Sequence, residues 1–187
     1  MNETTTIRHR TYEEIEHDHA RLEPSPRDTG TLELIVRRPA EDQREVLDEA
    51  QLDEREGLVG DKWRADALAD GDEIDPDEQL TLMNARVIGL IAGDRENWAP
   101  AGDQLFVDLD LGLENLPPGT RLSLGSAIIE VTAKPHTGCA EFSRRFGADA
   151  LRFISVPARR DQHMRGIYAR VIEPGTVRAG DVVRKMG

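Results

Sequence analysis

The sequence is poor in cysteine, because Cys139 is the only one among 187 residues. A single cysteine excludes an intramolecular disulfide and a zinc cluster built on several thiolates. Aromatic residues are also scarce, at 4% of the chain, whereas charged residues reach 32% and hydrophobic residues 38%. This composition is typical of a polar globular protein, and the length fits one domain with a small appendage.

Long apolar runs are also missing. No stretch approaches the ~20 apolar residues that a membrane-spanning helix needs. The polar start, Met1 to Arg10, lacks the apolar centre of a signal peptide. We therefore expect no membrane association and a reducing, cytoplasmic location.

Positive charge is in deficit, since 24 Lys and Arg stand against 36 Asp and Glu, for a net charge of −12. Binding to nucleic acid needs a basic face that neutralises phosphates, so no nucleic-acid partner is expected. A local basic pocket for a small anion is still compatible with this charge. The acidic stretch 41–56 is predicted to be a solvated connection without a partner, with a short strand near Val46 and Leu47.

Hydrophobic patterns predict a mainly β fold with a few short helices. Short runs of alternating or β-forming residues are separated by Gly/Pro turns, which is typical of a barrel or sandwich. These predicted strands cover residues 31–36, 79–83, 105–110, 121–124, 127–132, 166–172 and 182–185.

Two helices are predicted before the cysteine. Residues 11–14 have the form of a capping box, which starts a helix that ends near Leu22. Asn84 is suited to cap a second helix over residues 85–91.

The segment Gly57 to Trp63 is predicted to be a turn beside a strand, because its two glycines allow tight turns. Lys62 would be available there as an anion contact. The segment is no phosphate loop, since the GK[ST] signature is missing and no helix is expected after it. The acidic segment 65–78 is predicted to be a loop.

The stretch Lys134 to Gly147 predicts a loop that opens into a helix at Cys139. Free backbone N–H groups at a helix start and nearby cations favour a thiolate, which is a nucleophile and a soft metal ligand. The nearby cations are Lys134, Arg144, Arg145 and, if protonated, His136. The alternative is that Cys139 is a small buried hydrophobe without chemistry.

A second local excess of positive charge comprises Arg159, Arg160, His163 and Arg165. One interpretation is a solvated loop. The other is one wall of an anion pocket that is shared with Arg144 and Arg145.

The chain contains, in this order, the segments Gly57–Trp63, Asn115–Gly125, His136–Cys139, Arg144–Gly147, Arg165–Val171, Gly175–Val177 and Gly180–Asp181. Together they resemble a MOSC domain, the domain named for the C-terminal part of molybdenum cofactor sulfurases. The resemblance runs over about residues 30–187. It implies a MOSC-like β-barrel over residues 30–187, with residues 1–29 as an N-terminal extension that carries a short helix.

The resemblance implies that Cys139 carries sulfur as a persulfide or ligates molybdenum of a pterin cofactor. Lys62, Arg145 and Arg165 match places where basic or polar residues surround the pocket in relatives. The phosphate of such a cofactor would be a suitable partner for these cations. We therefore expect Cys139 to be the catalytic and metal-ligating residue. The expected cofactor-binding residues are Lys62, His136, Thr137, Arg144, Arg145 and Arg165.

The leading functional hypothesis is a small stand-alone MOSC protein that binds a molybdenum-pterin cofactor or a sulfur species through Cys139. Its enzymatic version reduces N-hydroxylated compounds, so the partner is a small molecule or a sulfur donor or acceptor protein. One alternative is a non-catalytic persulfide carrier, and another is a β-barrel module with an inert cysteine. The sequence predicts no particular oligomeric state.

Overall fold

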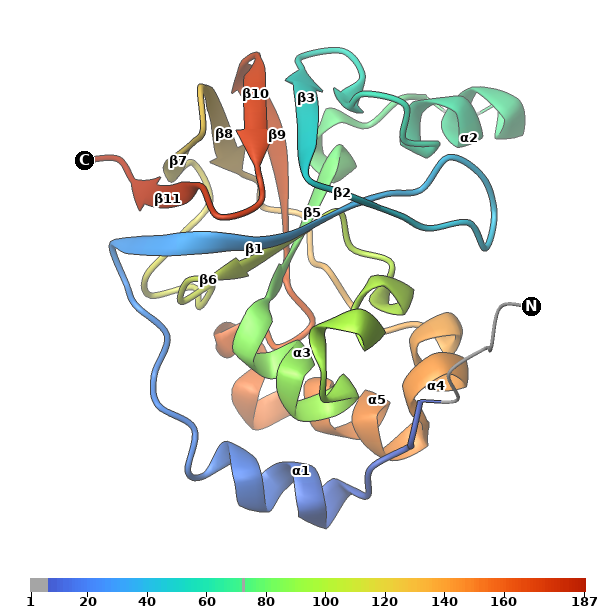
Figure 1. Cartoon of the computed structure of the whole chain (residues 1–187), viewed down its shortest axis with the longest axis vertical. Coiled ribbons are helices and arrows are strands. Elements are labelled where there is room, and N and C mark those ends of the chain that lie inside the picture. The colour runs from blue at the N-terminus through green and yellow to red at the C-terminus, as the bar shows by residue number, and fades with distance from the viewer. Residues whose placement is uncertain (1–6, 72) are drawn as a thin grey trace.

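A closed β-barrel forms the centre of the protein in a computed structural model, which describes residues 7–71 and 73–187 (Figure 1). Seven strands form the ring in the order β1-β11-β7-β8-β9-β5-β6, and β11 pairs with both β7 and β1 to close it. The predicted mainly β barrel with a few short helices is thereby confirmed. The strands are β1 (Thr29–Arg37), β5 (Leu80–Asn84), β6 (Leu105–Asp108), β7 (Arg121–Leu124), β8 (Ala127–Val131), β9 (Ile167–Glu173) and β11 (Val182–Lys185).

Neighbouring barrel strands run antiparallel except β5 and β6, which are parallel. Strand β2 (Glu45–Leu47) pairs with the end of β1 outside the ring. A second, three-stranded sheet consists of β10 (Gly175–Arg178), β3 (Glu49–Asp53) and β4 (Gly57–Leu58).

Helices α1 (Tyr12–His19), α3 (Ala85–Ala92), α4 (Ala140–Phe146) and α5 (Ala148–Ile154) gather on one side of the barrel, and α2 (Trp63–Asp70) lies apart from them (Figure 1). Four short 3₁₀ turns complete the fold. They are η1 (Pro76–Glu78), η2 (Arg95–Asn97), η3 (Ala99–Ala101) and η4 (Pro157–Gln162).

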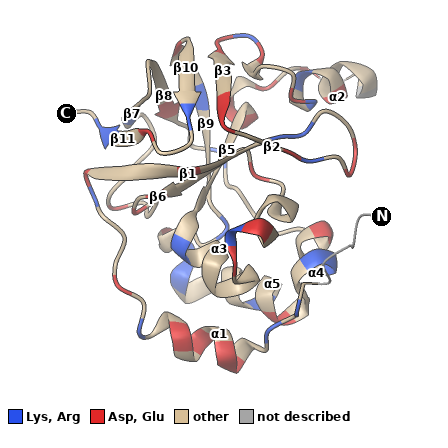
Figure 2. Cartoon of the chain, viewed as in Figure 1, with Lys and Arg blue, Asp and Glu red and all other residues tan. Residues whose placement is uncertain are grey.

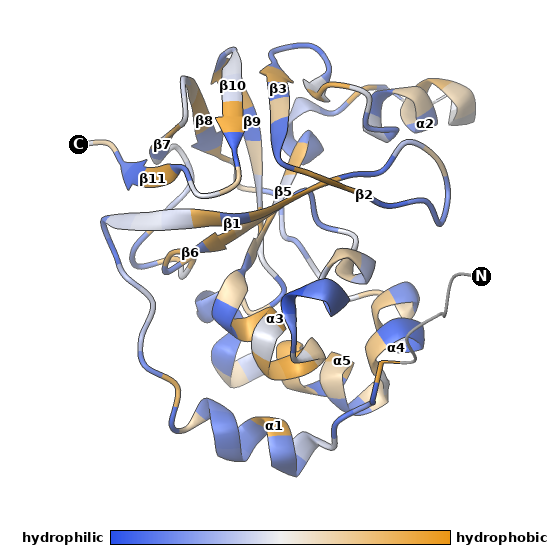
Figure 3. Ribbon diagram, viewed as in Figure 1, coloured by the Kyte–Doolittle hydropathy of each residue, from blue (hydrophilic) through white to orange (hydrophobic). Residues whose placement is uncertain are grey.

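Two apolar clusters hold these layers together. One fills the barrel with Leu, Ile, Val and Ala side chains from the strands and loops. The other lies between the barrel and the helices, where Phe106, Phe142, Phe146 and Phe153 are among the largest fully buried side chains. Apolar residues accordingly colour the strands and α3 (Figure 3). Burial of the apolar surface of these two clusters is the main contribution to the stability of the fold.

The predicted helix starts are confirmed by their hydrogen bonds. Thr11 Oγ1 accepts from Glu14 N at 3.2 Å, and Glu14 Oε2 accepts from Thr11 N at 2.9 Å, which completes a capping box. Helix α1 ends at His19 instead of Leu22. Asn84 Oδ1 accepts from Val87 N at 2.9 Å at the start of α3.

Two predictions for residues 41–78 are wrong. The acidic stretch contains β3 besides β2, and β3 pairs with β10 while burying Ala50 and Leu52. The loop predicted at 65–78 contains α2 and η1, so a helix does follow Lys62. Helix α2 escaped prediction because none of residues 63–69 is buried, so no apolar stripe marks it.

Charged residues of both signs are distributed along the described chain. Figure 2 shows Lys and Arg intermixed with Asp and Glu in the barrel and in the helices. Over the ranges 7–71 and 73–187, every helix is too short or too polar to cross a bilayer.

Candidate functional site

A pocket of about 370 Å³ lies at the barrel mouth, between the β1–β2 connection and α4. Five cationic and four carboxylate side chains line it, together with Trp63, Thr81, His136, Cys139 and Tyr168. The cationic side chains are Arg38, Arg44, Lys62, Arg145 and Arg165, and the carboxylates are Glu41, Asp42, Glu78 and Glu141.

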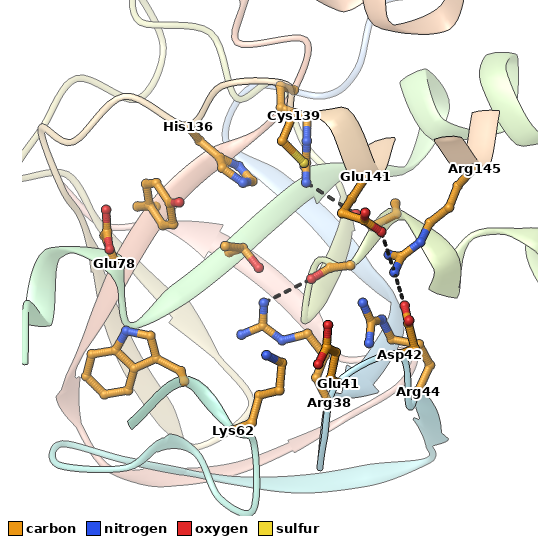
Figure 4. Close-up of a pocket in the computed structure, with 16 residues that line it drawn as sticks. Arg38, Glu41, Asp42, Arg44, Lys62, Glu78, His136, Cys139, Glu141 and Arg145 are labelled. Carbon is orange, nitrogen blue, oxygen red and sulfur yellow. Dashed lines mark hydrogen bonds and ion pairs between the residues drawn. The ribbon is translucent and has the colours of Figure 1, made fainter. Parts of the chain in front are cut away.

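Cys139 lies at the edge of this pocket and is exposed. It occupies the N-cap position of α4 in an extended conformation, with φ −127° and ψ 172°. The predicted loop that opens into a helix is thereby confirmed, and Gly147 is the C-cap residue of this helix. Figure 4 shows Cys139 and His136 on the opposite side of the pocket from Arg38, Arg44 and Lys62. The interpretation of Cys139 as a buried hydrophobe is wrong, because its side chain is accessible.

His136 is the buried aromatic wall beside the cysteine. Its side chain is 7% exposed, and its ring centroid lies 4.5 Å from that of Tyr168. Its Nδ1 atom is buried without a hydrogen-bond partner in the described chain, and it lies 3.8 Å from Asp103 Oδ1. A ligand in the pocket would therefore meet a histidine whose hydrogen-bonding capacity is not used up by the protein.

Two buried ion pairs fix arginines in the pocket wall. Arg165 Nη1 donates to both carboxylate oxygens of Asp103, at 2.8 and 2.7 Å, and the Asp103 side chain is fully buried. Arg38 makes a bidentate pair with Asp61, at 2.7 and 2.9 Å. Planar guanidinium groups held in this way present fixed donors to the remaining space.

The other predicted site residues are only partly brought together. Lys62 and Arg145 line the pocket, but Lys62 pairs with Asp66, and Arg145 pairs with Asp42 at 2.8 Å. Arg144 is 60% exposed, lies outside the pocket lining and pairs with the lining carboxylate Glu141. Thr137 is exposed and is also outside the lining. The cofactor-binding roles of these residues therefore stay predictions.

The second cationic cluster does not form one wall of the pocket. Arg159 pairs with Glu16 of α1, and His163 Nδ1 contacts Leu111 O at 2.8 Å. From the cluster predicted over residues 159–165, only Arg165 lines the pocket. Arg159 thus links the η4 turn to the N-terminal helix, His163 links the end of η4 to the body of the protein, and Arg160 is exposed.

Sequence reasoning missed Arg38, Arg44 and Asp103. Arg38 follows β1 directly, and Arg44 stands within the acidic stretch that was expected to be an inert surface. Trp63 and Tyr168 lie in segments that resemble the family, but nothing in the sequence marked these two residues as part of a site. Because no periodic pattern marks any of these residues, only the tertiary structure reveals that they share one pocket.

The donor set limits what the pocket can bind. No group of three or more His, Cys, Asp and Glu side chains that could hold a metal ion exists in the portion of the chain described here. A metal at Cys139 would therefore need further ligands from an organic cofactor. One soft sulfur, several guanidinium groups and an unpartnered histidine nitrogen fit an anionic metal-carrying cofactor better than a bare ion.

We predict a pH dependence of stability that originates at His136. Burial lowers the pKa of His136 to about 3, and the Arg165 guanidinium acts in the same direction. Below about pH 6.5 the unfolded chain therefore binds a proton at His136 that the folded protein does not bind. The contribution of His136 to the free energy of unfolding is fully present above that pH. It falls as the pH decreases toward 3, by at most ~1.4 kcal/mol per pH unit. His136→Gln should flatten this slope in urea unfolding measured from pH 7 to pH 4.

The matched control for this prediction is His17→Gln, because His17 is exposed on α1. It should leave the slope unchanged. Some slope is expected to persist in His136→Gln, since burial also lowers the pKa of His19. Identical slopes in the wild-type protein and His136→Gln would contradict the prediction.

Comparison with known proteins finds one matching family model and several solved structures of similar fold. A family model described as MOSC domain matches residues 76–184. The crystal structure of the YuaD protein from Bacillus subtilis has a TM-score of 0.60 at 18% identity, covering 83% of this chain and 94% of that chain. That of YiiM from Escherichia coli has a TM-score of 0.53 at 21% identity, covering 84% and 70%. Such low identities show a shared fold alone. No curated protein matches the chain in sequence.

Proposed function

Because this chain belongs to the MOSC family, we propose that its barrel-mouth pocket binds a molybdenum-pterin cofactor or a sulfur species through Cys139. The observation that carries this proposal is the exposed thiol of Cys139 at the edge of a pocket lined by five cationic side chains. A thiolate is a soft ligand for molybdenum, and it is also the nucleophile that takes a sulfane sulfur from a donor persulfide while the donor leaves as a thiolate.

Each part of the pocket has a role in this proposal. Cys139 supplies the sulfur ligand, and Lys62, Arg145 and Arg165 face the anionic part of the cofactor. His136 offers a neutral ring to the ligand at physiological pH, because burial lowers its pKa to about 3. Trp63 and Tyr168 add aromatic surface that a planar ring system can contact.

When bound, the cofactor supplies the two-electron chemistry that reduction of an N-hydroxylated compound requires. The surrounding residues would then position the substrate next to Cys139 and limit the access of water. The carrier alternative rests on the exposure of the same thiol alone, without the cationic lining of the pocket. An exposed persulfide on Cys139 can reach an acceptor protein without any opening of the barrel.

Metal and pterin analysis of protein purified from a host that makes the cofactor tests the proposal. The cofactor version predicts molybdenum and pterin in equal amounts, close to one per chain. The carrier version predicts no molybdenum and a mass increment of one sulfur on Cys139. Protein with neither would contradict both versions and leave the inert β-barrel module.

A further inference from the structure

A second, smaller cavity adjoins the barrel-mouth pocket. It has a volume of about 290 Å³ and lies between the start of α2 and the segment 73–78. We call this cavity the side pocket. The two cavities meet along one wall, because they share the lining residues Arg38, Lys62, Trp63 and Glu78.

Carboxylates outnumber cations in the lining of the side pocket. Both cations are already committed, because Arg38 forms a bidentate pair with Asp61 and Lys62 pairs with Asp66. The side pocket therefore has an excess of negative charge, whereas cations are in the majority in the barrel-mouth pocket. The carboxylates of the side pocket are Asp66, Glu73, Asp75 and Glu78, and its cations are Arg38 and Lys62.

Three of these carboxylates have one counter-ion between them. Lys134 Nζ lies 2.6 Å from Asp75 Oδ2 and 2.9 Å from Glu78 Oε1, and Lys134 is outside the lining. Among the residues that the structure describes, Glu73 forms no ion pair. One lysine therefore stands against three carboxylates, so the side pocket attracts a cationic ligand.

An organic cation suits this space better than a metal ion. In the described part of the chain, no three His, Cys, Asp or Glu side chains come together closely enough to hold a metal. The carboxylates of the side pocket thus surround a space of about 290 Å³ instead of converging on a point. A cavity of ~150 Å³ already holds a benzene ring, so this one has room for a ring with a charged substituent.

Trp63 gives the side pocket an aromatic wall. It is the first residue of α2 and lines both cavities. None of residues 63–69 is buried, so the indole is not part of the apolar core and is available to a ligand. The face of a tryptophan ring is the best aromatic partner for an organic cation. Glu78 lies on the opposite side of the barrel-mouth pocket from Arg145 (Figure 4), so the acidic space begins away from the exposed end of α4.

We infer that the side pocket binds an arylalkylammonium group of the small-molecule substrate whose reacting group lies at Cys139. This inference deepens the proposed function and rests on it for the reaction at Cys139. The ring of the substrate lies on Trp63, and its ammonium group faces Glu73 and Glu78. His136, with its unpartnered Nδ1 atom, stands at the other end of the same compound, next to Cys139. The two cavities then select opposite charges, an anionic cofactor in one and a cationic substrate group in the other.

Calorimetric titration of cofactor-free protein with benzylamine tests the inference. Benzylamine is protonated at pH 7, and benzyl alcohol is its uncharged counterpart of nearly the same shape. We expect the wild-type protein to bind benzylamine at least about tenfold more tightly than benzyl alcohol, because the ion pairs and the cation–π contact need the charge. No binding of benzylamine, or equal binding of the two compounds, would overturn the inference.

Two variants locate the bound benzylamine. Glu73→Gln should weaken the binding of benzylamine about threefold and leave that of benzyl alcohol unchanged, because it removes one exposed charge. Trp63→Leu should weaken the binding of both compounds, because it removes the aromatic wall. Glu173→Gln is the matched control, since Glu173 is exposed at the end of β9 outside both linings, and it should bind as the wild type does. Wild-type affinity in both Glu73→Gln and Trp63→Leu would place benzylamine elsewhere and overturn the inference.

Cys139→Ser separates this inference from the proposed function. The variant should bind benzylamine as tightly as the wild-type protein, even if Cys139 holds neither metal nor sulfur. The titration needs neither cofactor nor activity, so it decides the inference whether or not any reduction is found. In protein that reduces N-hydroxylated compounds, Glu73→Gln should raise KM for a compound with an ammonium side chain and leave KM for a neutral one and kcat for both unchanged. An equal rise in KM for both compounds would contradict the selection by charge.

Discussion

Cys139→Ser is expected to abolish retention of molybdenum or of persulfide sulfur while leaving the protein folded. Serine replaces a soft, ionisable sulfur by a hard oxygen that stays protonated at neutral pH, so neither soft metal nor sulfane sulfur is held. Metal analysis and intact-protein mass spectrometry of the wild type and the variant measure the effect. At the proposed site the loss should be complete.

The fold should tolerate this change because Cys139 is exposed at the N-cap of α4 and makes no side-chain cap hydrogen bond. Serine is a favoured N-cap residue, so the melting temperature should stay the same or rise slightly. Ala140→Ser is a matched control at the adjacent exposed position and should retain metal or sulfur. If the wild-type protein holds molybdenum or persulfide sulfur and Cys139→Ser holds the same amount, the claim for this residue ends.

Asp103→Asn is expected to be the most destabilising conservative change in the pocket. Asp103 is fully buried and binds Arg165, which is 8% exposed. Removing the carboxylate charge leaves a buried guanidinium without compensation, which costs ~3–5 kcal/mol of unfolding free energy. Urea unfolding at pH 7 measures this loss as a lower midpoint at unchanged slope.

A double variant distinguishes the lost charge from a general packing defect. Asp103→Leu combined with Arg165→Met removes both charges and replaces them by apolar side chains, so it should recover most of the stability that the single change loses. If Asp103→Asn loses less than ~1 kcal/mol, the pair is effectively solvated and the argument from burial fails.

Much of the fold follows from local patterns. The alternating runs of β1, β5, β6 and the β7–β8 hairpin were predictable because each has one face in the barrel core. Helices α1 and α3 were predictable from their N-cap residues, Thr11 and Asn84. Strand β3 was not predictable, because its three polar residues, Glu49, Gln51 and Asp53, outnumber the two residues that it buries.

The site was predictable only where the sequence carries a rare residue or a family motif. Cys139 and His136 stand in one segment of the chain, so their proximity was expected. Arg38 and Arg44 come from more than ninety residues earlier, and only the closure of the barrel mouth brings them opposite Cys139 (Figure 4). The carboxylate that sets the orientation of Arg165 lies on another segment again, and no local pattern marks Asp103.

The closure of the barrel by β11 has a consequence for the order of folding during synthesis. Residues 182–185 form β11, which pairs with both β1 and β7. Most of the chain separates β11 from β1, and about sixty residues separate it from β7. The ring therefore cannot close until β11 has left the ribosome, and until then β1 and β7 each keep an open edge that can pair with other chains. Such late, long-range pairing also predicts slow folding. We therefore expect chaperones to protect the open edges of β1 and β7 until β11, the last strand of the barrel, has emerged.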